Sequence, residues 1–340
     1  MLIYNLKLKD LEDDILNNGF KKYRAMQVFE WLYQKKISNF SDMSNIGSDL
    51  MVYLNEKYQM DCLTLVKQTE SSDQTVKLLY KLNDGNLIET VLMKHHYGLS
   101  LCITSQVGCN MGCLFCASGR LKKMRDLETA EMLAQVIKTE KILDVKINSV
   151  VVMGIGEPFD NYDNLVAFLE TINHPKGMAI GARHLTVSTC GIIPKIYEFA
   201  KLNTQVNLAI SLHSANNEKR AELMPINKRY PLNDLMNAIR DYIKSTGRRV
   251  TIEYILIKDI NDSLDDAKAL SRLLKGMNVY VNLIPYNEVE ELDIKRSAIE
   301  SRNKFYQLLV NENIDVTLRR ETGGDIDAAC GQLRSKNGGL

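Results

Sequence analysis

The chain has 340 residues, of which 45% are hydrophobic and 25% are charged, the usual balance of a globular enzyme. The formal net charge is only +1, so overall charge does not indicate a nucleic-acid-binding protein, and any site for a polyanion would be a local basic patch. No run approaches the ~18 consecutive apolar residues of a membrane span, and the N-terminus turns acidic at once, unlike a signal peptide. We therefore expect a cytoplasmic protein.

The first 95 residues predict a small accessory module of helices followed by a β-hairpin. Residues 20–36 carry apolar side chains at helical spacing. The NDGN run at 83–86 lies between two strand-like runs within residues 75–94, which is typical of a hairpin turn. We therefore predict an accessory module at residues 1–95 and a second domain at residues 96–340.

From residue 100 onward, strand-like and helical patterns alternate. The strand-like runs are residues 101–106, 149–154, 184–189, 206–213, 250–257, 279–286 and 315–320. The helical patterns are residues 129–141, 161–172, 231–244, 264–275 and 297–311. Repeated β–α units predict an α/β fold with a parallel barrel or partial barrel. In such barrels the chemistry lies on the loops that follow the strands.

A cysteine motif follows the first of these strands. Cys109, Cys113 and Cys116 have the spacing C-x3-C-x2-C. Three thiolates on one loop can hold a [4Fe–4S] cluster and leave one iron open, and this iron can bind the amino and carboxylate groups of S-adenosylmethionine. A structural zinc site normally needs four ligands, and no second pair of cysteines follows. The motif is the signature of the radical S-adenosylmethionine superfamily, which this chain resembles.

Polar groups follow the later strands of the predicted barrel. They are Gly156 and Glu157, Ser188, the run Ser211-Leu212-His213, and Asn287. A carboxylate on a glycine-rich turn suits the ammonium group of S-adenosylmethionine, and the hydroxyls and imidazole suit its ribose or carboxylate. Taken alone, the glycines are equally explained by a tight strand–helix turn, and His213 by a structural hydrogen bond. Their positions behind the cysteine loop favour a site for S-adenosylmethionine.

Two further cysteines lie outside the motif. From composition alone, Cys102 and Cys330 are inert thiols. However, the chain combines CITSQVGCNMGCLFC with LMPINKRYP, VNLIPYN and RRETGGDIDAACGQLR. These motifs, in this order over nearly the whole chain, resemble the RlmN/Cfr family of radical S-adenosylmethionine RNA adenosine methyltransferases, with RlmN the closer branch. The resemblance implies a partial (β/α)6 radical-SAM barrel with a small N-terminal helical module and β-hairpin.

The resemblance also implies a reaction that consumes two molecules of S-adenosylmethionine per turnover. The first methylates Cys330, and the second is cleaved at the cluster to a radical that takes a hydrogen from the S-methyl group. The methylene then adds to an adenine carbon, and Cys102 resolves the adduct through a disulfide with Cys330. Glu89 matches the base that removes the ring proton, although a solvated strand carboxylate would explain it as well.

The implied substrate is C2 of a conserved adenosine in 23S rRNA near the peptidyl transferase centre, and an adenosine in some tRNAs. The electron donor would be a protein such as flavodoxin or ferredoxin. The N-terminal module would help to bind RNA. Basic side chains that could contact it are Arg120, Lys122, Lys123, Arg125, Lys228 and Arg229, although such runs are more often solvated faces.

Three alternatives remain open from the sequence. Val107 and the GEP turn at 156–158 favour the C2-methylating RlmN branch, whereas LMPINKRYP and the GCNMGC loop lean towards Cfr, which methylates C8 of the same rRNA adenosine and gives antibiotic resistance. A non-catalytic iron–sulfur redox sensor would not need Cys102 and Cys330. A radical enzyme for a small molecule would leave the N-terminal module without a purpose.

Overall fold

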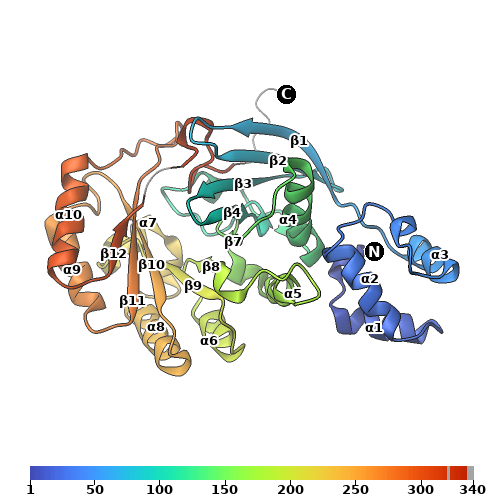
Figure 1. The fold of residues 1–340 in the computed structure, drawn as a ribbon. Coiled ribbons are helices and arrows are strands. Elements are labelled where there is room, and N and C mark those ends of the chain that lie inside the picture. Colours follow the sequence, from blue (N-terminus) through green and yellow to red (C-terminus); the bar gives the residue numbers. More distant parts are fainter. Residues whose placement is uncertain (320–321, 335–340) are drawn as a thin grey trace.

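The computed structural model describes residues 1–319 and 322–334, and one large twisted sheet runs through it (Figure 1). The order of its strands is β1-β2-β3-β4-β7-β8-β9-β10-β11-β12. Their bounds are β1 (Leu63–Glu70), β2 (Val76–Leu82), β3 (Leu87–His95), β4 (Gly98–Ile103), β7 (Ser149–Val152), β8 (Leu185–Thr189), β9 (Asn207–Ser211), β10 (Val250–Leu256), β11 (Val279–Pro285) and β12 (Val316–Leu318). Two short strands, β5 (Gln106–Val107) and β6 (Arg125–Asp126), pair separately.

The strands from β4 to β12 are parallel, and helices connect them. The connecting helices are α4 (Thr129–Leu143), α5 (Tyr162–Asn173), α6 (Ile193–Lys201), α7 (Asn217–Leu223), α8 (Leu232–Thr246), α9 (Leu264–Leu274) and α10 (Ile299–Asn311). This succession of β–α units confirms the predicted α/β barrel class. Each strand-like run and each of the five helical patterns of the sequence overlaps one of these elements, although residue 320 of the last run lies outside the described residues. The short helices α6 and α7 were not predicted.

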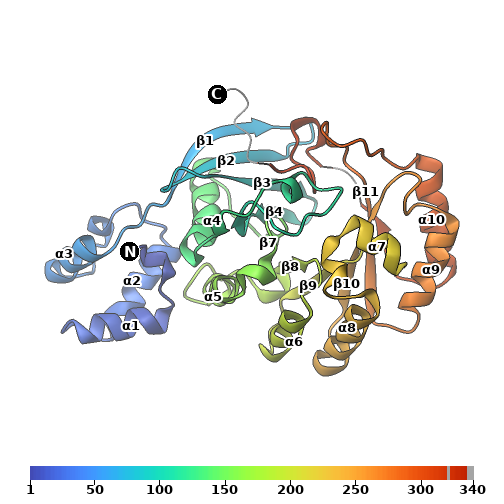
Figure 2. The same ribbon diagram turned by 180° about the vertical axis from the view of Figure 1, so that it is seen from behind.

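The sheet curls so that its late strands approach the early ones. Arg319, directly after β12, brings its Nη2 to 3.9 Å from the Sδ of Met93 in β3. Since β3 and β12 are well separated in the order of strands, only a strongly curved sheet brings them together. The helices cover the outer face of the curl (Figures 1 and 2), and the main hydrophobic core lies between them and the strands.

The N-terminal part contains α1 (Leu8–Asn17), α2 (Tyr23–Tyr33) and α3 (Ser48–Lys57), which lie at one end of the molecule (Figure 1). The predicted hairpin is present as β2 and β3. A third antiparallel strand, β1, was missed because most of its residues are exposed and its apolar residues do not alternate. The boundary near residue 95 stays a prediction, because β3 pairs with β4 across it in a continuous sheet.

Short 3-10 helices complete the described structure. They are η1 (Ile3–Asn5), η2 (Phe40–Asp42), η3 (Ala117–Arg120), η4 (Pro158–Asn161), η5 (Ala182–His184), η6 (Pro225–Lys228) and η7 (Gly324–Ile326). Among the residues described, no helix has both the length and the apolar character needed to cross a membrane.

Candidate active site

The loop after β5 carries the cysteine motif and folds back on itself. Gly108 has φ +76°, and a Cβ there would lie 2.2 Å from the backbone oxygen of Lys122. The amide of Cys109 donates to the oxygen of Leu121 at 2.9 Å, which closes the loop. Only glycine allows this close approach, so the residue before the first cysteine is part of the framework of the site.

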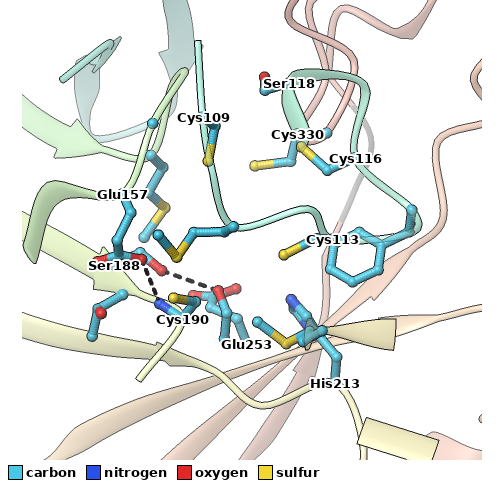
Figure 3. Close-up of a pocket in the computed structure, with 18 of the residues that line it drawn as sticks. Cys109, Cys113, Cys116, Ser118, Glu157, Ser188, Cys190, His213, Glu253 and Cys330 are labelled. Atoms are coloured by element: carbon cyan, nitrogen blue, oxygen red, sulfur yellow. Dashed lines mark hydrogen bonds between the residues drawn. The ribbon is translucent and has the colours of Figure 1, made fainter. Parts of the chain in front are cut away.

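The three cysteines of the motif line one cavity at the carboxyl ends of the parallel strands. Most of the strand-end residues singled out in the sequence line the same cavity, namely Gly156, Glu157, Ser188, Ser211 and His213, and so does Cys330. Figure 3 shows the thiol groups of Cys109, Cys113, Cys116 and Cys330 around this space. Residues distant in the sequence therefore converge at the position where α/β barrels carry their chemistry.

The donor set fits an iron–sulfur cluster. Burial raises the pKa of all three thiols, to about 12 for Cys109, so they need a strong positive charge at the site to bind as thiolates. Within residues 1–319 and 322–334, no three His, Cys, Asp or Glu side chains are arranged to hold a single metal ion. The thiols surround a space instead of converging on one point, which suits a group of several irons held by Cys109, Cys113 and Cys116 better than zinc.

Glu157 presents a buried carboxylate to the cavity. One carboxylate oxygen accepts from the amide of Phe159 at 3.0 Å and the other from the amide of Cys190 at 2.7 Å (Figure 3). Burial raises its pKa, and these backbone hydrogen bonds oppose that effect. A buried carboxylate is stable when a cation neutralises it, which the ammonium group of S-adenosylmethionine would do.

The turn before Glu157 is held rigidly. Gly156 has φ +107°, and a Cβ there would lie 2.6 Å from the Cβ of Gln106. The side-chain oxygen of Gln106 accepts from the amide of Glu157 at 2.8 Å. Gln106 was not singled out in the sequence, yet it fixes the direction of the carboxylate, and its place at the start of the cysteine loop is the only signal for it.

The hydroxyls of Ser188 and Ser211 and the imidazole of His213 line the same cavity, with Ser188 beside Glu157 (Figure 3). The Oγ atoms of Ser188 and Ser211 are 3.4 Å apart (Figure 3). The Nδ1 of His213 accepts from the amide of Ile255 at 3.2 Å, and burial, aided by the charge of Arg220, lowers its pKa to about 3. A neutral imidazole with Nδ1 as acceptor carries its proton on Nε2, so His213 can donate a hydrogen bond to a ligand.

Leu212 and Asn287 are placed differently from the other predicted ligand-binding residues. Leu212 is fully buried and does not line the thiol cavity. Asn287 lies behind Cys330: its Nδ2 donates to the backbone oxygen of Cys330 at 3.1 Å, and its buried Oδ1 has no hydrogen-bond partner among residues 1–319 and 322–334. A buried oxygen without a hydrogen bond is unfavourable, so this Oδ1 would suit a hydrogen-bond donor on a ligand. Their roles in binding stay predictions.

Cys102 and Cys330 share a second, smaller cavity. It is lined by apolar residues of β3, β4 and β7 together with Arg319. Burial raises the pKa of Cys102 to about 12, with a further increase from the nearby Cys330 and an opposing effect of Arg319. Both cysteines are free thiols. Because Cys330 lines this chamber as well as the thiol cavity, its sulfur lies at the junction of the two.

The segment that carries Cys330 is fastened to the turn between β1 and β2. Ser71 and Ser72 donate to the carboxylate of Asp325, and the amide of Gly323 donates to Asp73 at 2.9 Å. Further along, the Nζ of Lys77 donates to the backbone oxygen of Asp327 at 3.1 Å. These bonds join segments about 250 positions apart and define what we call the clasp, residues 71–73 with 323–327.

Glu89 lies on the same face of the sheet as Cys102, since it is two positions from Val91, the pairing partner of Cys102. Glu89 is only 3% exposed, and its carboxylate accepts a hydrogen bond from the amide of Arg334 at 2.7 Å. It also forms an ion pair with the Nζ of Lys77 at 3.3 Å. It lines a separate cavity with Lys67 and Lys77. It is therefore not a solvated strand carboxylate, and its role as a base stays a prediction.

The basic residues after the cysteine loop divide into two groups. Lys123 pairs with Asp126 and Asp160, and Arg125 with Asp84 and Glu131, so their charges are already neutralised within the chain. The exposed residues are Arg120, Lys122, Lys228 and Arg229, and the Nη1 of Arg120 also donates to the backbone oxygen of Glu291 at 3.0 Å. Of the predicted RNA contacts, Arg120, Lys122, Lys228 and Arg229 therefore have the most accessible charges.

Two buried charged residues were missed in the sequence. Glu253 lines the thiol cavity from the middle of β10 and accepts from the Nδ2 of Asn282 at 2.8 Å. Arg220 is completely buried and donates to the backbone oxygens of Cys190 and Leu212, so it ties together the ends of β8 and β9. The signal for Glu253 was a lone carboxylate inside an otherwise apolar strand.

Comparison with protein families matches two sequence models to the chain. Residues 103–270 match the model of the radical SAM superfamily, and residues 2–60 match a ribosomal RNA large subunit methyltransferase N-terminal domain. A protein of Acholeplasma laidlawii, named as a probable dual-specificity RNA methyltransferase RlmN, is 57% identical over 99% of this chain and 100% of its own length. A protein of Spiroplasma citri with the same name is 53% identical over 99% of this chain and 98% of its own length. Another of that name, from Enterococcus faecalis, is 54% identical over 98% of this chain and 96% of its own length.

A solved structure has the same fold. The crystal structure of a radical SAM methyltransferase from Sphaerobacter thermophilus superimposes with a TM-score of 0.94 at 40% sequence identity. The match covers 99% of this chain and 100% of that chain.

Proposed function

The chain belongs to the RlmN family of radical S-adenosylmethionine RNA methyltransferases, and on that premise we propose that it methylates C2 of an adenosine in 23S rRNA, near the peptidyl transferase centre, and of an adenosine in some tRNAs. The family uses S-adenosylmethionine and a [4Fe–4S] cluster. Two features support the proposal: the relatives are named dual-specificity enzymes, and residues 2–60 match a domain named for a ribosomal RNA methyltransferase. An RNA substrate also agrees with the expected cytoplasmic location.

The position of Cys330 carries the proposal. Its thiol lines the cavity of Cys109, Cys113 and Cys116 and also the chamber of Cys102. A sulfur that carries a methyl group must face the cofactor, and a sulfur that is later released by a second thiol must face that thiol. A single residue at the junction meets both requirements, which a redox sensor or a simple electron carrier would not need.

Separate residues of the chain would hold the cluster and bind S-adenosylmethionine. Cys109, Cys113 and Cys116 would hold the cluster, which when bound supplies the electron that cleaves S-adenosylmethionine. Glu157 would bind the ammonium group of S-adenosylmethionine, and Ser188, Ser211 and His213 would orient the rest of it by hydrogen bonds.

The two remaining cysteines would carry the methyl group and release the product. The thiol of Cys330 would take it from a first molecule of S-adenosylmethionine, so that two molecules are used per turnover. Cys102 would release the product by forming a disulfide with Cys330, and an electron-transfer protein such as flavodoxin or ferredoxin would supply reducing equivalents.

The base to be methylated would enter from the side of Glu89. The cavity of Glu89 is lined by the exposed Lys67, whose positive charge suits a phosphate of an extruded nucleotide, whereas Lys77 pairs with Glu89 and Arg334 pairs with Asp327 and Glu291. The carboxylate of Glu89 would then take the proton from the ring carbon. C2 of adenine is electrophilic and a poor target for direct methyl transfer, so a radical route through a sulfur-bound carbon replaces it.

Mass spectrometry of RNA tests the proposal. The anaerobically reconstituted enzyme is incubated with S-adenosylmethionine, a reductant and either 23S rRNA or tRNA, and the nucleosides are analysed. We expect 2-methyladenosine in both RNAs. Finding 8-methyladenosine would instead assign the C8 reaction, and finding no methylated adenosine in either RNA would reject the proposed function.

The variant Cys330→Ala is the matched control. It should retain the iron and the bound S-adenosylmethionine but form no methylated adenosine, because the carrier of the methyl group is gone. Methylation by Cys330→Ala would refute the sulfur-bound route, and cleavage of S-adenosylmethionine without any effect of RNA would favour an enzyme for a small molecule.

A further inference from the structure

Arg220 is a completely buried cation on helix α7. Its guanidinium donates to the backbone oxygen of Leu212 at 3.1 Å, to that of Cys190 at 2.8 Å and to the Oδ1 of Asn227 at 2.7 Å. All of these acceptors are neutral, and in the part of the chain that the structure describes no carboxylate forms an ion pair with Arg220. A buried cation is unfavourable unless a negative charge lies near it, so this position calls for an anion.

The thiol cavity lies directly beyond these hydrogen bonds. The Nη2 of Arg220 donates to the backbone oxygens of Cys190 and, at 3.4 Å, of Ser211, and both residues line the cavity. Burial lowers the pKa of Arg220 to about 10, and the nearby thiols of Cys190 and Cys113 oppose this effect. The guanidinium therefore keeps its positive charge at neutral pH, and that charge acts on Cys113, a predicted ligand of the cluster.

The segment after α7 packs against the cysteine loop. The backbone oxygen of Leu223, the last residue of the helix, accepts from the amide of Leu114 at 2.9 Å. A Cβ at Gly112 would lie 3.7 Å from the Cγ of Pro225, which is van der Waals contact. Both contacts are made by the LMPINKRYP run, residues 223–231, to which the proposed function assigns no role. The helix and the loop are thus joined, and the guanidinium has a fixed place behind the cavity.

The other charged groups at the cavity do not supply a free positive charge. Two carboxyl groups, Glu157 and Glu253, line it, and when ionised they oppose the addition of further negative charge. Burial raises the pKa of Glu253, and the positive charge of Arg319 opposes this effect, so Arg319 already acts on a carboxyl group. Arg220 has no such partner, and its charge remains available to the cavity.

We propose that Arg220 supplies a fixed positive charge behind the thiol cavity that favours the reduced state of the [4Fe–4S] cluster. The inference rests on the proposed function and adds a residue to it. In the reduction, one electron passes to the cluster from the electron-transfer protein, which is oxidised, and no bond breaks and no proton moves. A nearby buried cation stabilises the extra negative charge, because the protein interior screens it little. Net charge is one of the factors that set the reduction potential of a cluster.

A potentiometric titration tests this role without RNA or S-adenosylmethionine. The anaerobically reconstituted holoenzyme is reduced stepwise with dithionite in the presence of mediator dyes, and electron paramagnetic resonance measures the reduced cluster at each potential. The readout is a midpoint potential and not methylation, so its failure is separate from failure of the proposed function.

The variant Arg220→Gln removes the charge. At a given potential, we expect the ratio of reduced to oxidised cluster to fall by about tenfold, which lowers the midpoint potential of this one-electron step by about 59 mV. This is the effect of two unit charges roughly 12 Å apart at an effective dielectric constant of about 20. Arg220→Lys keeps the charge and should have a midpoint potential close to that of the unsubstituted protein.

Two further variants separate the charge from the packing. Asn227→Asp leaves Arg220 and its oxygen acceptor in place but adds a negative charge beside the guanidinium, so it should also lower the midpoint potential. The matched control is Arg248→Gln. The Nη2 of Arg248 also donates to an asparagine oxygen, the Oδ1 of Asn207 at 2.9 Å, but Asn207 begins β9 whereas Ser211 ends it. The control therefore removes a guanidinium at the far end of the same strand and should leave the midpoint potential unchanged.

An unchanged midpoint potential in Arg220→Gln would overturn the proposal, as would an equal fall in Arg220→Gln and Arg220→Lys, which would indicate a merely structural role. A shift in Arg248→Gln as large as that in Arg220→Gln would do the same, because the position of the lost charge would then not matter. If Arg220→Gln does not fold or bind iron, as judged by circular dichroism and iron content, Asn227→Asp decides: a midpoint potential equal to that of the unsubstituted protein would refute the role of Arg220.

Discussion

The turn that carries Glu157 offers a quantitative test of the cofactor site. In Gly156→Ala, a side chain must adopt φ +107°, a conformation that costs about 1–3 kcal/mol. Its Cβ would also lie 2.6 Å from the Cβ of Gln106, closer than any real contact, and relieving such overpacking costs a further ~1–3 kcal/mol. We therefore expect the free energy of unfolding to fall by about 2–6 kcal/mol.

The relief of this clash must move either Gln106 or the turn. Both movements disturb the hydrogen bond from the amide of Glu157 to Gln106 and turn the carboxylate away from the cavity. Hydrogen bonds to a charged group contribute about 1.5–3 kcal/mol. The affinity for S-adenosylmethionine should then fall by roughly 10- to 100-fold.

Gly85→Ala is the control for backbone strain alone. Gly85 has φ +89°, but a Cβ there would meet nothing within 4 Å. This variant should lose only ~1–2 kcal/mol and bind S-adenosylmethionine normally. Urea denaturation measures the stability, and equilibrium dialysis of labelled S-adenosylmethionine against the anaerobically reconstituted enzyme measures the affinity. If Gly156→Ala bound S-adenosylmethionine within twofold of the unsubstituted enzyme, the role assigned to this turn would be refuted.

Two further substitutions test electrostatic features of the fold and the site. Burial alone would raise the pKa of Asp84, but the hydrogen bonds led by Arg125 lower it to about 2, so the stabilising effect of this carboxylate exists above about pH 4 and is lost as the pH falls towards 2. Since Asp84 is partly exposed, Asp84→Asn should lower the free energy of unfolding by about 1 kcal/mol at neutral pH. Urea denaturation should show a smaller loss of stability at pH 3, and an equal loss at both pH values would contradict this account. Glu89→Gln keeps an acceptor for the amide of Arg334 but removes the proposed base, so RNA methylation should slow by about 10²-fold or more while S-methylation of Cys330, followed by peptide mass spectrometry, continues. An unchanged rate of RNA methylation in Glu89→Gln would rule out this role.

The sequence predicted the elements of the barrel and the group of residues around the thiol cavity. Both follow from local patterns: the apolar runs of the strands, and polar groups at their carboxyl ends. Glu157 could be assigned because its neighbours, Gly156 and Pro158, mark a turn after a strand. Helix α7 was missed because its seven residues are too short to show a helical period.

The surroundings of Glu89 and Arg319 could not be predicted in this way. The burial of Glu89 depends on Arg334, 245 positions away, and the contact of Arg319 with Met93 spans 226 positions. No local pattern records such pairs. From the sequence, Glu89 therefore resembles an ordinary strand carboxylate, and Arg319 resembles the polar end of a strand. Only the curved sheet places their partners beside them.

The clasp has a consequence for how the enzyme is made. Ser71 and Asp325 are 254 positions apart, so the ribosome finishes the turn that receives the C-terminal segment long before it synthesises that segment. Until that segment is in place, the cavity of Cys109, Cys113 and Cys116 lacks part of its wall, because Cys330 and Gly331 line it. On the proposed function, the sulfur that takes the methyl group therefore joins the site only when residues 323–327 fold against the turn at 71–73.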